Sequence, residues 1–241
     1  MIQIKNISLT LLILCIFSAT NAQQIDTIKT NKLFKKAILP ISLISAGVLI
    51  NKSTFEKTFQ TNIRNKVGNT YDNKIDDFIL FAPIVEMYAA DLIGVKSKNH
   101  WFNQSKYLFI SNVISSTLTN RLKVITKKTR PNGDERSFPS GHTTIAFTNA
   151  AVLHQEFKES SPILAYSGYA FATATAGFRV VNNKHWVSDA LVGAGIGILV
   201  TELVYHFEPL KNFNPFKKNK NISLLPQFSG DSYAVYFSYN F

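Results

Sequence analysis

Cysteine is nearly absent from this sequence. The single cysteine among 241 residues, Cys15, lies within the first 22 residues. The rest of the chain therefore has no thiol that could act as a nucleophile, bind a metal or form a disulfide. Functions that depend on cysteine chemistry are excluded for residues 23–241.

Acidic residues are also scarce. The chain has 15 Asp and Glu against 26 Lys and Arg, a formal net charge of +11 at pH 7, although charged residues make up only 17% of it. A basic surplus attracts phosphate groups. The sequence has no basic, aromatic-interleaved module of the kind that binds nucleic acid. Anionic lipid headgroups or phosphate esters are the expected partners, and nucleic acid is not.

The first 22 residues have the pattern of an export signal. Lys5 precedes an apolar run from Ile7 to Phe17, and small residues follow up to Ala22. This order is typical of a signal peptide. We predict that residues 1–22 are cut off after Ala22 and that the protein is exported to the bacterial cell envelope. The alternative is an uncleaved membrane anchor, which the shortness of the apolar run disfavours.

The apolar pattern predicts an all-α fold for residues 23–210, a six-helix bundle in a single domain. Pro162 fits the start of the fifth helix, and Asn132-Gly133-Asp134 breaks the chain between the third and the fourth. Residues 52–74, the most polar part of the interior, are expected to be a solvated connection with some short helix rather than a dedicated binding site. The six expected helices are residues 37–51, 76–95, 105–126, 140–157, 162–181 and 186–207.

Residues 211–241 are expected to be a separate tail. The segments "NISLLPQF" and "YAVYFSYNF" flank "SGDS", and the second alternates aromatic and small or polar residues. This pattern predicts a short C-terminal β-hairpin with an aromatic face. A terminal run of this kind is also found in outer-membrane barrels, but two strands cannot close a barrel.

The predicted helices differ in their suitability for crossing a bilayer. Residues 160–178 are uncharged and residues 190–201 are wholly apolar or small, whereas residues 76–95 include Glu86 and Asp91. The first predicted helix, residues 37–51, is too short to span comfortably. We therefore expect it to lie along the interface or the bundle surface, which places the loops after the third and fifth helices outside the cytoplasm.

Three short segments lie at helix ends and contain reactive residue types. They are "KVITKKTRP" at 123–131, "PSGH" at 139–142 and "RVVNNKHWVSD" at 179–189. In an antiparallel bundle the loops after the third and fifth helices open on one side, and the fourth helix begins there. The three segments are therefore expected to meet.

The cations in these segments suit an oxyanion. Lys123, Arg130 and Arg179 would form a phosphate cradle, because a guanidinium can donate two parallel hydrogen bonds to a tetrahedral oxyanion. Ser140 is a good N-cap, and Gly141 allows a ligand to approach the free N–H groups of the first helical turn.

His185 and Asp189 are spaced to lie on one face of a helix. The carboxylate can then hold one imidazole N–H and leave the other nitrogen free to attack, as in a nucleophilic histidine. Taken alone, such a pair is more often a surface contact.

The combination of Lys-x6-Arg-Pro, Pro-Ser-Gly-His and Arg-x5-His-x3-Asp between Lys123 and Asp189 resembles the type 2 phosphatidic acid phosphatase (PAP2) superfamily. That superfamily includes lipid phosphatases, bacterial class A acid phosphatases and vanadium haloperoxidases, and a six-helix layout is typical of it. Phe178 departs from the pattern, because the family commonly has Ser before the third-motif Arg.

The resemblance implies a role for each motif residue. His185 would form a phosphohistidine, Asp189 would orient it, and His142 would protonate the leaving alcohol and then activate water. Neither a metal nor a cofactor would be required. The phosphate oxygens would be held by Lys123, Arg130, Ser140, Gly141 and Arg179.

Several functions stay open on the sequence alone. A membrane-associated lipid phosphatase is favoured, and a soluble periplasmic acid phosphatase acting on small phosphate esters is the second candidate. A vanadium haloperoxidase and a non-catalytic protein that binds anionic lipid are less favoured. The remaining histidines, His100, His154 and His206, have no partner at metal-ligand spacing.

Overall fold

The computed structural model describes residues 27–68, 70–207, 209–212, 222–229 and 232–239. The predicted signal peptide, residues 1–22, lies outside these ranges. The chain divides into a helical body that ends at His206 and a C-terminal unit, Phe207–Phe241. The two units are described separately.

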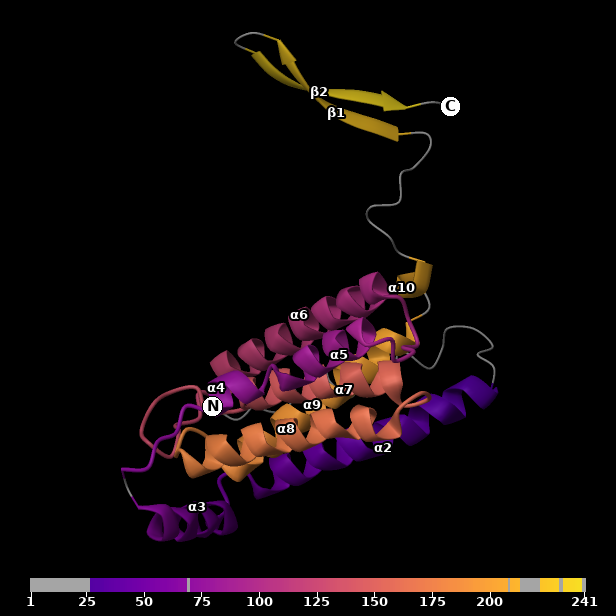
Figure 1. Cartoon of the computed structure of the whole chain (residues 1–241). Helices are drawn as coiled ribbons and strands as arrows, with labels where there is room; N and C mark the ends of the chain where they lie inside the picture. The colour runs from indigo at the N-terminus through magenta and orange to yellow at the C-terminus, as the bar shows by residue number, and fades with distance from the viewer. Residues whose placement is uncertain (1–26, 69, 208, 213–221, 230–231, 240–241) are drawn as a thin grey trace. The chain divides into compact units, whose positions relative to one another are not determined.

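The helical body consists of helices joined by short connections (Figure 1). The prediction of an all-helical body is confirmed. The helices are α2 (Thr27–Ile50), α3 (Thr54–Val67), α4 (Asp76–Ile79), α5 (Ala82–Leu92), α6 (Trp101–Thr126), α7 (Gly141–Phe157), α8 (Pro162–Val181) and α9 (Val187–His206).

The predicted number of six helices is wrong. The connection at 52–74, where some short helix was expected, contains the 14-residue α3, whose N-cap Ser53 accepts a hydrogen bond from the Glu56 N–H. The single helix expected at 76–95 is two helices, α4 and α5, because Pro83 suits the first turn of a new helix better than the interior of a longer one.

The first predicted helix is also too short. α2 begins at Thr27, ten residues before the expected start, and therefore includes Lys35 and Lys36. Lysine is a good helix former, so the charges near the start of the apolar run do not end the helix. Two helices of the described chain, α2 over Leu33–Ile50 and α9, are long and apolar enough to cross a membrane by length and composition.

α9 lies at the centre of the body and packs against α2, α6, α7 and α8. Its glycines allow this close packing. A Cβ at Gly197 would lie 2.6 Å from the Thr144 carbonyl oxygen of α7, and a Cβ at Gly195 would lie 2.6 Å from the Pro40 carbonyl oxygen of α2. Only glycine fits at these two positions. The glycines of "GAGIGILV" therefore let α9 pack closely against α7 and α2.

The C-terminal unit contains the short helix α10 (Pro209–Asn212) and two strands, β1 (Ile222–Ser229) and β2 (Ser232–Tyr239). The strands pair antiparallel, with Ile222 opposite Tyr239 and Ser229 opposite Ser232. Residues 230 and 231 lie outside the described ranges.

Candidate active site

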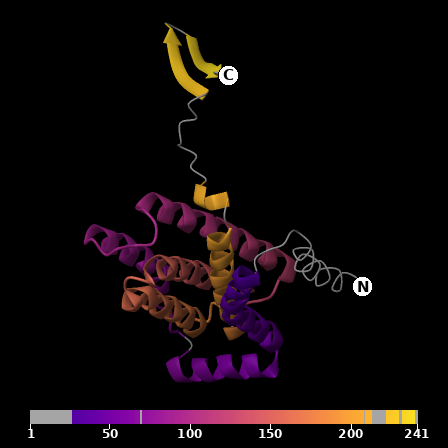
Figure 2. The same ribbon diagram turned by 90° about the vertical axis from the view of Figure 1, so that its right-hand side faces the viewer.

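The predicted site residues lie at one end of the helical body. The C-terminal ends of α6 and α8 and the N-terminal ends of α7 and α9 meet there, together with α4 (Figure 1). α3 lies at the lower edge of the body in both views, and its first turn contacts the same end (Figure 2). The meeting of the three segments follows from the antiparallel order of α6 to α9.

His185 and Asp189 form a buried pair at the start of α9. His185 Nδ1 lies 3.3 Å from Asp189 Oδ2, and only 1% of the histidine is exposed. Burial lowers the pKa of His185 to about 4, although Asp189 opposes this effect. The imidazole is therefore neutral at physiological pH, with Nε2 left as the nitrogen that can attack an electrophile.

The N-terminus of α7 lies beside this pair. Ser140 caps the helix, because its Oγ accepts a hydrogen bond from the Thr143 N–H, and its own N–H donates to the Asp189 carbonyl at 3.0 Å. A Cβ at Gly141 would lie 3.9 Å from the Lys123 side chain. The first N–H groups of α7 and the Lys123 ammonium therefore lie on the same side of the site.

Lys123 is held at the C-terminal end of α6. Its ammonium donates to the Arg136 carbonyl at 2.8 Å and to the Ser137 carbonyl at 3.3 Å. Burial lowers the pKa of Lys123 to about 8, and the nearby Arg130 adds to the effect. This lysine is therefore a cation at neutral pH that loses its proton more readily than an exposed lysine.

The two predicted arginines each have a hydrogen-bond donor without a partner. Arg130 Nε and Arg179 Nε are buried and make no hydrogen bond within the described part of the chain. A second atom of Arg179, Nη1, donates to Asp76 at 2.7 Å, which fixes the guanidinium. Buried polar groups are nearly always paired, so two orphaned guanidinium donors indicate a place for an anion.

Arg179 is electrostatically connected to the other site residues. Burial lowers the pKa values of Lys123, Arg130, His142 and His185, and the positive charge of Arg179 lowers each of them further. Direct contacts place Arg179 and both histidines together: His142 and Arg179 both lie beside Asp77, and the backbone N–H of His185 donates to the Arg179 carbonyl at 3.1 Å.

His142 has an acidic partner that we did not predict from the sequence. Its Nε2 lies 2.9 Å from Asp77 Oδ1 of α4. Asp77 also lies 3.8 Å from Arg179 Nη1, next to the buried Asp76. Burial and then Arg179 lower the pKa of His142, and Asp77 opposes them.

A further set of buried polar residues surrounds Asp189. Lys128 and Ser137 both contact its carboxylate, and Glu56 of α3 contacts Lys128. The expected solvated connection is wrong for Glu56, which is 1% exposed. The Ser53-x-x-Glu56 spacing is a capping-box pattern. It was the one available signal that Glu56 lies in the first turn of a helix.

Phe178 is partly buried near the end of α8 and has no hydroxyl to offer a phosphate where the family commonly has serine. Among the described residues there is no group of three or more His, Cys, Asp or Glu side chains that could hold a metal ion.

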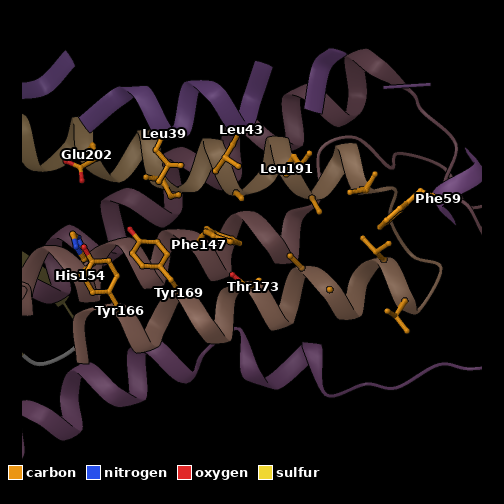
Figure 3. A pocket seen from close by; sticks show the side chains of 18 of the residues that line it. Leu39, Leu43, Phe59, Phe147, His154, Tyr166, Tyr169, Thr173, Leu191 and Glu202 are labelled. Carbon is orange, nitrogen blue, oxygen red and sulfur yellow. The ribbon is translucent and has the colours of Figure 1, made fainter. Parts of the chain in front are cut away.

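An apolar groove runs beside α2, between α8 and α9, with a volume of about 770 Å³ (Figure 3). Leu39 and Leu43 of α2 and Leu191 of α9 form one wall, and Tyr169 of α8 lies opposite. In this view Glu202 lies near one end of the groove.

The groove reaches the end of the body that contains the site. Val180 and Val187 line it, the first next to Arg179 and the second two residues after His185. Much of the outer surface of α2, beside the groove, is apolar and exposed. Over residues 33–50 of this helix the exposed large hydrophobic residues are Phe34, Ile38, Leu39, Ile41, Val48 and Leu49.

The sequence profile of the PAP2 superfamily matches residues 125–213. The matched segment contains seven of the eight predicted site residues, and the eighth, Lys123, lies two residues before it. The resemblance of this segment to the superfamily is confirmed.

Two characterised proteins are similar to the chain. A lipid A 1-phosphatase of Porphyromonas gingivalis is 33% identical over 148 residues, which is 59% of this chain and 33% of that protein. An acid phosphatase of Zymomonas mobilis is 30% identical over 104 residues, 43% of this chain and 34% of that protein. The chain thus matches about a third of the length of each relative.

Among solved structures, Aquifex aeolicus LpxE aligns with a TM-score of 0.49 at 20% identity and covers 66% of this chain and 99% of that one. A transmembrane PAP2-type phosphatidylglycerolphosphate phosphatase from Bacillus subtilis aligns with a TM-score of 0.43 at 18% identity and covers 88% of this chain and 98% of that one.

Proposed function

We propose that this protein is a metal-independent phosphatase that hydrolyses a phosphate monoester or pyrophosphate of a lipid through a phosphohistidine intermediate. The observation that carries the proposal is the pair of buried, unpartnered guanidinium donors on Arg130 and Arg179, close to a buried neutral His185 that Asp189 orients. A site that only bound an anion would need the cations but not this histidine pair.

In the first step, His185 Nε2 attacks phosphorus and the bond from phosphorus to the leaving oxygen breaks. His142 donates a proton to that oxygen, so the alcohol departs neutral. Asp189 accepts the Nδ1–H of His185 and stabilises the positive charge that develops on the ring. The equatorial oxygens are held by Lys123, Arg130, Arg179 and the N-terminus of α7, capped by Ser140 and Gly141.

In the second step, His142, now neutral, accepts a proton from water as the water attacks phosphorus. The nitrogen–phosphorus bond breaks, and inorganic phosphate leaves. His185 returns to its neutral form, still held by Asp189, and His142 is again protonated for the next turnover. Asp77 suits His142 for this double role, because its carboxylate contacts the imidazole and favours the protonated form.

The groove beside α2 favours a lipid over a small soluble ester. Its walls are mainly apolar, its volume of about 770 Å³ falls in the range of small-molecule sites, and Val187 lines it close to His185. Transfer of a hydrocarbon chain from water into the groove would be favourable by about 0.8 kcal/mol per buried CH₂ group. The relative from P. gingivalis is a lipid A 1-phosphatase, which supports a lipid substrate here as well.

We place the protein in the cell envelope, embedded in or associated with a membrane, with the site facing the periplasm. The exposed apolar surface of α2 fits the position at the interface or the bundle surface that we expected from the sequence, although the helix is long and apolar enough to span a membrane. A spanning α2 after an exported signal would place its C-terminal end, and with it the site, in the cytoplasm. A cysteine in place of Asn132, an exposed loop residue near the site, tests the orientation. A membrane-impermeant thiol reagent should label it once the outer membrane is permeabilised, and failure to label it would contradict the periplasmic orientation.

The function is tested with detergent-purified protein and a panel of phosphorylated lipids, lipid pyrophosphates and small phosphate esters. We expect phosphate release from lipids, inhibition by vanadate and no effect of EDTA. Equal turnover of small esters by protein released by osmotic shock would favour a soluble acid phosphatase. The Z. mobilis relative is an acid phosphatase. Activity lost with EDTA and restored by a divalent ion would contradict the proposed mechanism.

A further inference from the structure

Lys128 is a fully buried cation in the loop after α6. Only 5% of it is exposed, and its ammonium has three donors that meet three side chains. It donates to Glu56 at 2.9 Å, to Ser188 Oγ at 2.8 Å and to Asp189 Oδ1 at 3.0 Å. A buried charge is costly unless it is paired and hydrogen-bonded, and Lys128 meets both conditions.

The carboxylate of Asp189 is held on both oxygens. Oδ1 accepts from Lys128, while Oδ2 accepts from Ser137 Oγ and from the Trp186 N–H at 2.9 Å and faces His185 Nδ1. The position of Oδ2, which orients His185, is thus set partly by what Oδ1 binds. Lys128 is the only charged side chain of the described residues that forms an ion pair with Oδ1.

Glu56 fixes Lys128 from the opposite side. It lies in the first turn of α3, where the Lys52 N–H donates to its Oε2 at 2.7 Å and the Ser188 hydroxyl donates to its Oε1. α3 lies outside the segment 125–213 that matches the family profile. The acid that anchors Lys128 therefore comes from a part of the chain that the motifs do not include.

The charges in this cluster decide the ionisation of Asp189. Two buried carboxylates, Glu56 and Asp189, share the one ammonium of Lys128. Without this cation, two negative charges so close together would favour protonation of one of the two acids. A protonated Asp189 could no longer accept the Nδ1–H of His185 as an anion. The lysine therefore acts on the histidine through the aspartate.

We propose that Lys128, anchored by Glu56, is a positioning residue that keeps Asp189 ionised and oriented toward His185. The proposal rests on the proposed function, since it concerns the residue pair that would form and support the phosphohistidine. Neither Lys128 nor Glu56 touches the phosphate in this account. Their effect is exerted on the protonation of the His185–Asp189 pair.

The proposal predicts opposite effects for two variants. In Lys128→Met, loss of a positive charge favours protonation of the pair, so the acid limb of the kcat profile moves to higher pH. In Glu56→Gln, loss of a negative charge disfavours protonation, so the limb moves to lower pH. We expect kcat of Lys128→Met to fall by roughly 10- to 100-fold with KM little changed. Residues that orient the ligands of a metal ion have effects of this size.

Lys127→Met is the matched control, because Lys127 is the exposed neighbour of Lys128 and lies outside the site. Its kcat and its acid limb should equal those of the wild type. Lys128→Met leaves two buried acids without their cation and is the variant at risk of not folding. Glu56→Gln retains the Lys128–Asp189 ion pair and tests the proposal independently.

NMR of ¹⁵N-histidine-labelled protein separates this proposal from the proposed function. The His185 signals should titrate at higher pH in Lys128→Met and at lower pH in Glu56→Gln, whether or not any substrate is turned over. If the wild type released no phosphate from the whole panel, the proposed function would fail while the NMR test still applied. Shifts in the same direction, or no shift of the His185 titration in either variant, would overturn the positioning role.

Discussion

The imidazole of His142 and the carboxylate of Asp77 lie 2.9 Å apart, although 64 residues of chain separate them. The histidine lies in the first turn of α7, and the aspartate belongs to the short helix α4. Asp77 favours the protonated form of His142, whereas burial and Arg179 favour the neutral form. The balance between these effects sets the pH range in which His142 can act as an acid.

Asp77→Asn should move the alkaline limb of the kcat profile to lower pH. Asp77 raises the pKa of His142, so its removal lowers that pKa, and the proton needed by the leaving alcohol is lost at lower pH. The shift should be clear for alkyl phosphates and small for aryl phosphates, whose leaving groups need less protonation. Steady-state kinetics across the pH range with both substrate types measure it.

Glu135→Gln is the control for this change, because Glu135 is an exposed acid in the loop before α7. Its pH profile should match that of the wild type. An unchanged alkaline limb in Asp77→Asn, or an equal shift for both substrate types, would mean that His142 is not the general acid.

Lys123 should make phosphate binding depend on pH above neutrality. Its pKa is lowered to about 8, so the cation is present below that pH and is lost as the pH rises through it. Inhibition by inorganic phosphate should then weaken by up to about tenfold per pH unit above this point, in proportion to the fraction of protonated lysine. Inhibition constants measured at several pH values test this dependence.

Lys123→Arg should remove that dependence, because a guanidinium keeps its proton throughout this range. Lys127→Arg, the same change at an exposed position, should behave like the wild type. If the inhibition constant of Lys123→Arg rose with pH as steeply as that of the wild type, Lys123 would not be the group responsible.

Gly177 offers a way to fill the groove without disturbing the fold. It lines the groove on α8, and a Cβ there would meet no atom within 4 Å. Gly177→Leu should abolish or strongly reduce turnover of long-chain lipids while leaving a small aryl phosphate unaffected. The change should also stabilise the helix slightly, since glycine is about 1 kcal/mol less favourable than alanine in a helix interior.

Ala174→Leu is the matched control on the same helix, at an exposed position outside the groove lining. Its activity toward both substrates should remain that of the wild type. If Gly177→Leu turned over long-chain lipids normally, the hydrocarbon chain would have to bind elsewhere.

Gly197→Leu should have the opposite effect on stability. Its Cβ would lie 2.6 Å from the Thr144 carbonyl oxygen and 2.8 Å from the Thr148 backbone nitrogen, so α7 and α9 would have to separate. Overpacking of this kind costs about 1–3 kcal/mol and sometimes more. Thermal unfolding of Gly197→Leu and Gly177→Leu in the same detergent should give a lower Tm for the first variant only.

The helices around the motifs could be predicted because the relevant signals are local. Ser140 caps α7 as expected from its place before Gly141, and Pro162 begins α8. The convergence of the motif segments also followed from the sequence, since antiparallel helices joined by short loops leave few alternatives. The start of α2 was missed because Lys35 and Lys36 resemble a boundary, although they continue the helix.

The partners of the motif residues could not be predicted. Glu56 and Asp77 reach the site through tertiary contacts, across 72 positions to Lys128 and 65 positions to His142. Lys128 resembles any other lysine in a basic run, and only burial distinguishes it from Lys127. Periodicity and spacing give the residues of one helix face, but they do not indicate which distant acid faces a given cation.

The most direct test of the account is the detection of a phosphoryl group on His185. An aryl phosphate is used with His142→Ala, because its leaving group needs little protonation while hydrolysis of the intermediate still needs a base. We expect alkaline-quenched protein, examined by mass spectrometry, to contain one phosphoryl group on His185 in His142→Ala, much less in the wild type and none in His185→Ala. Phosphate release by the wild type with no phosphoryl group on His185 in His142→Ala, or with the group on another residue, would contradict the account.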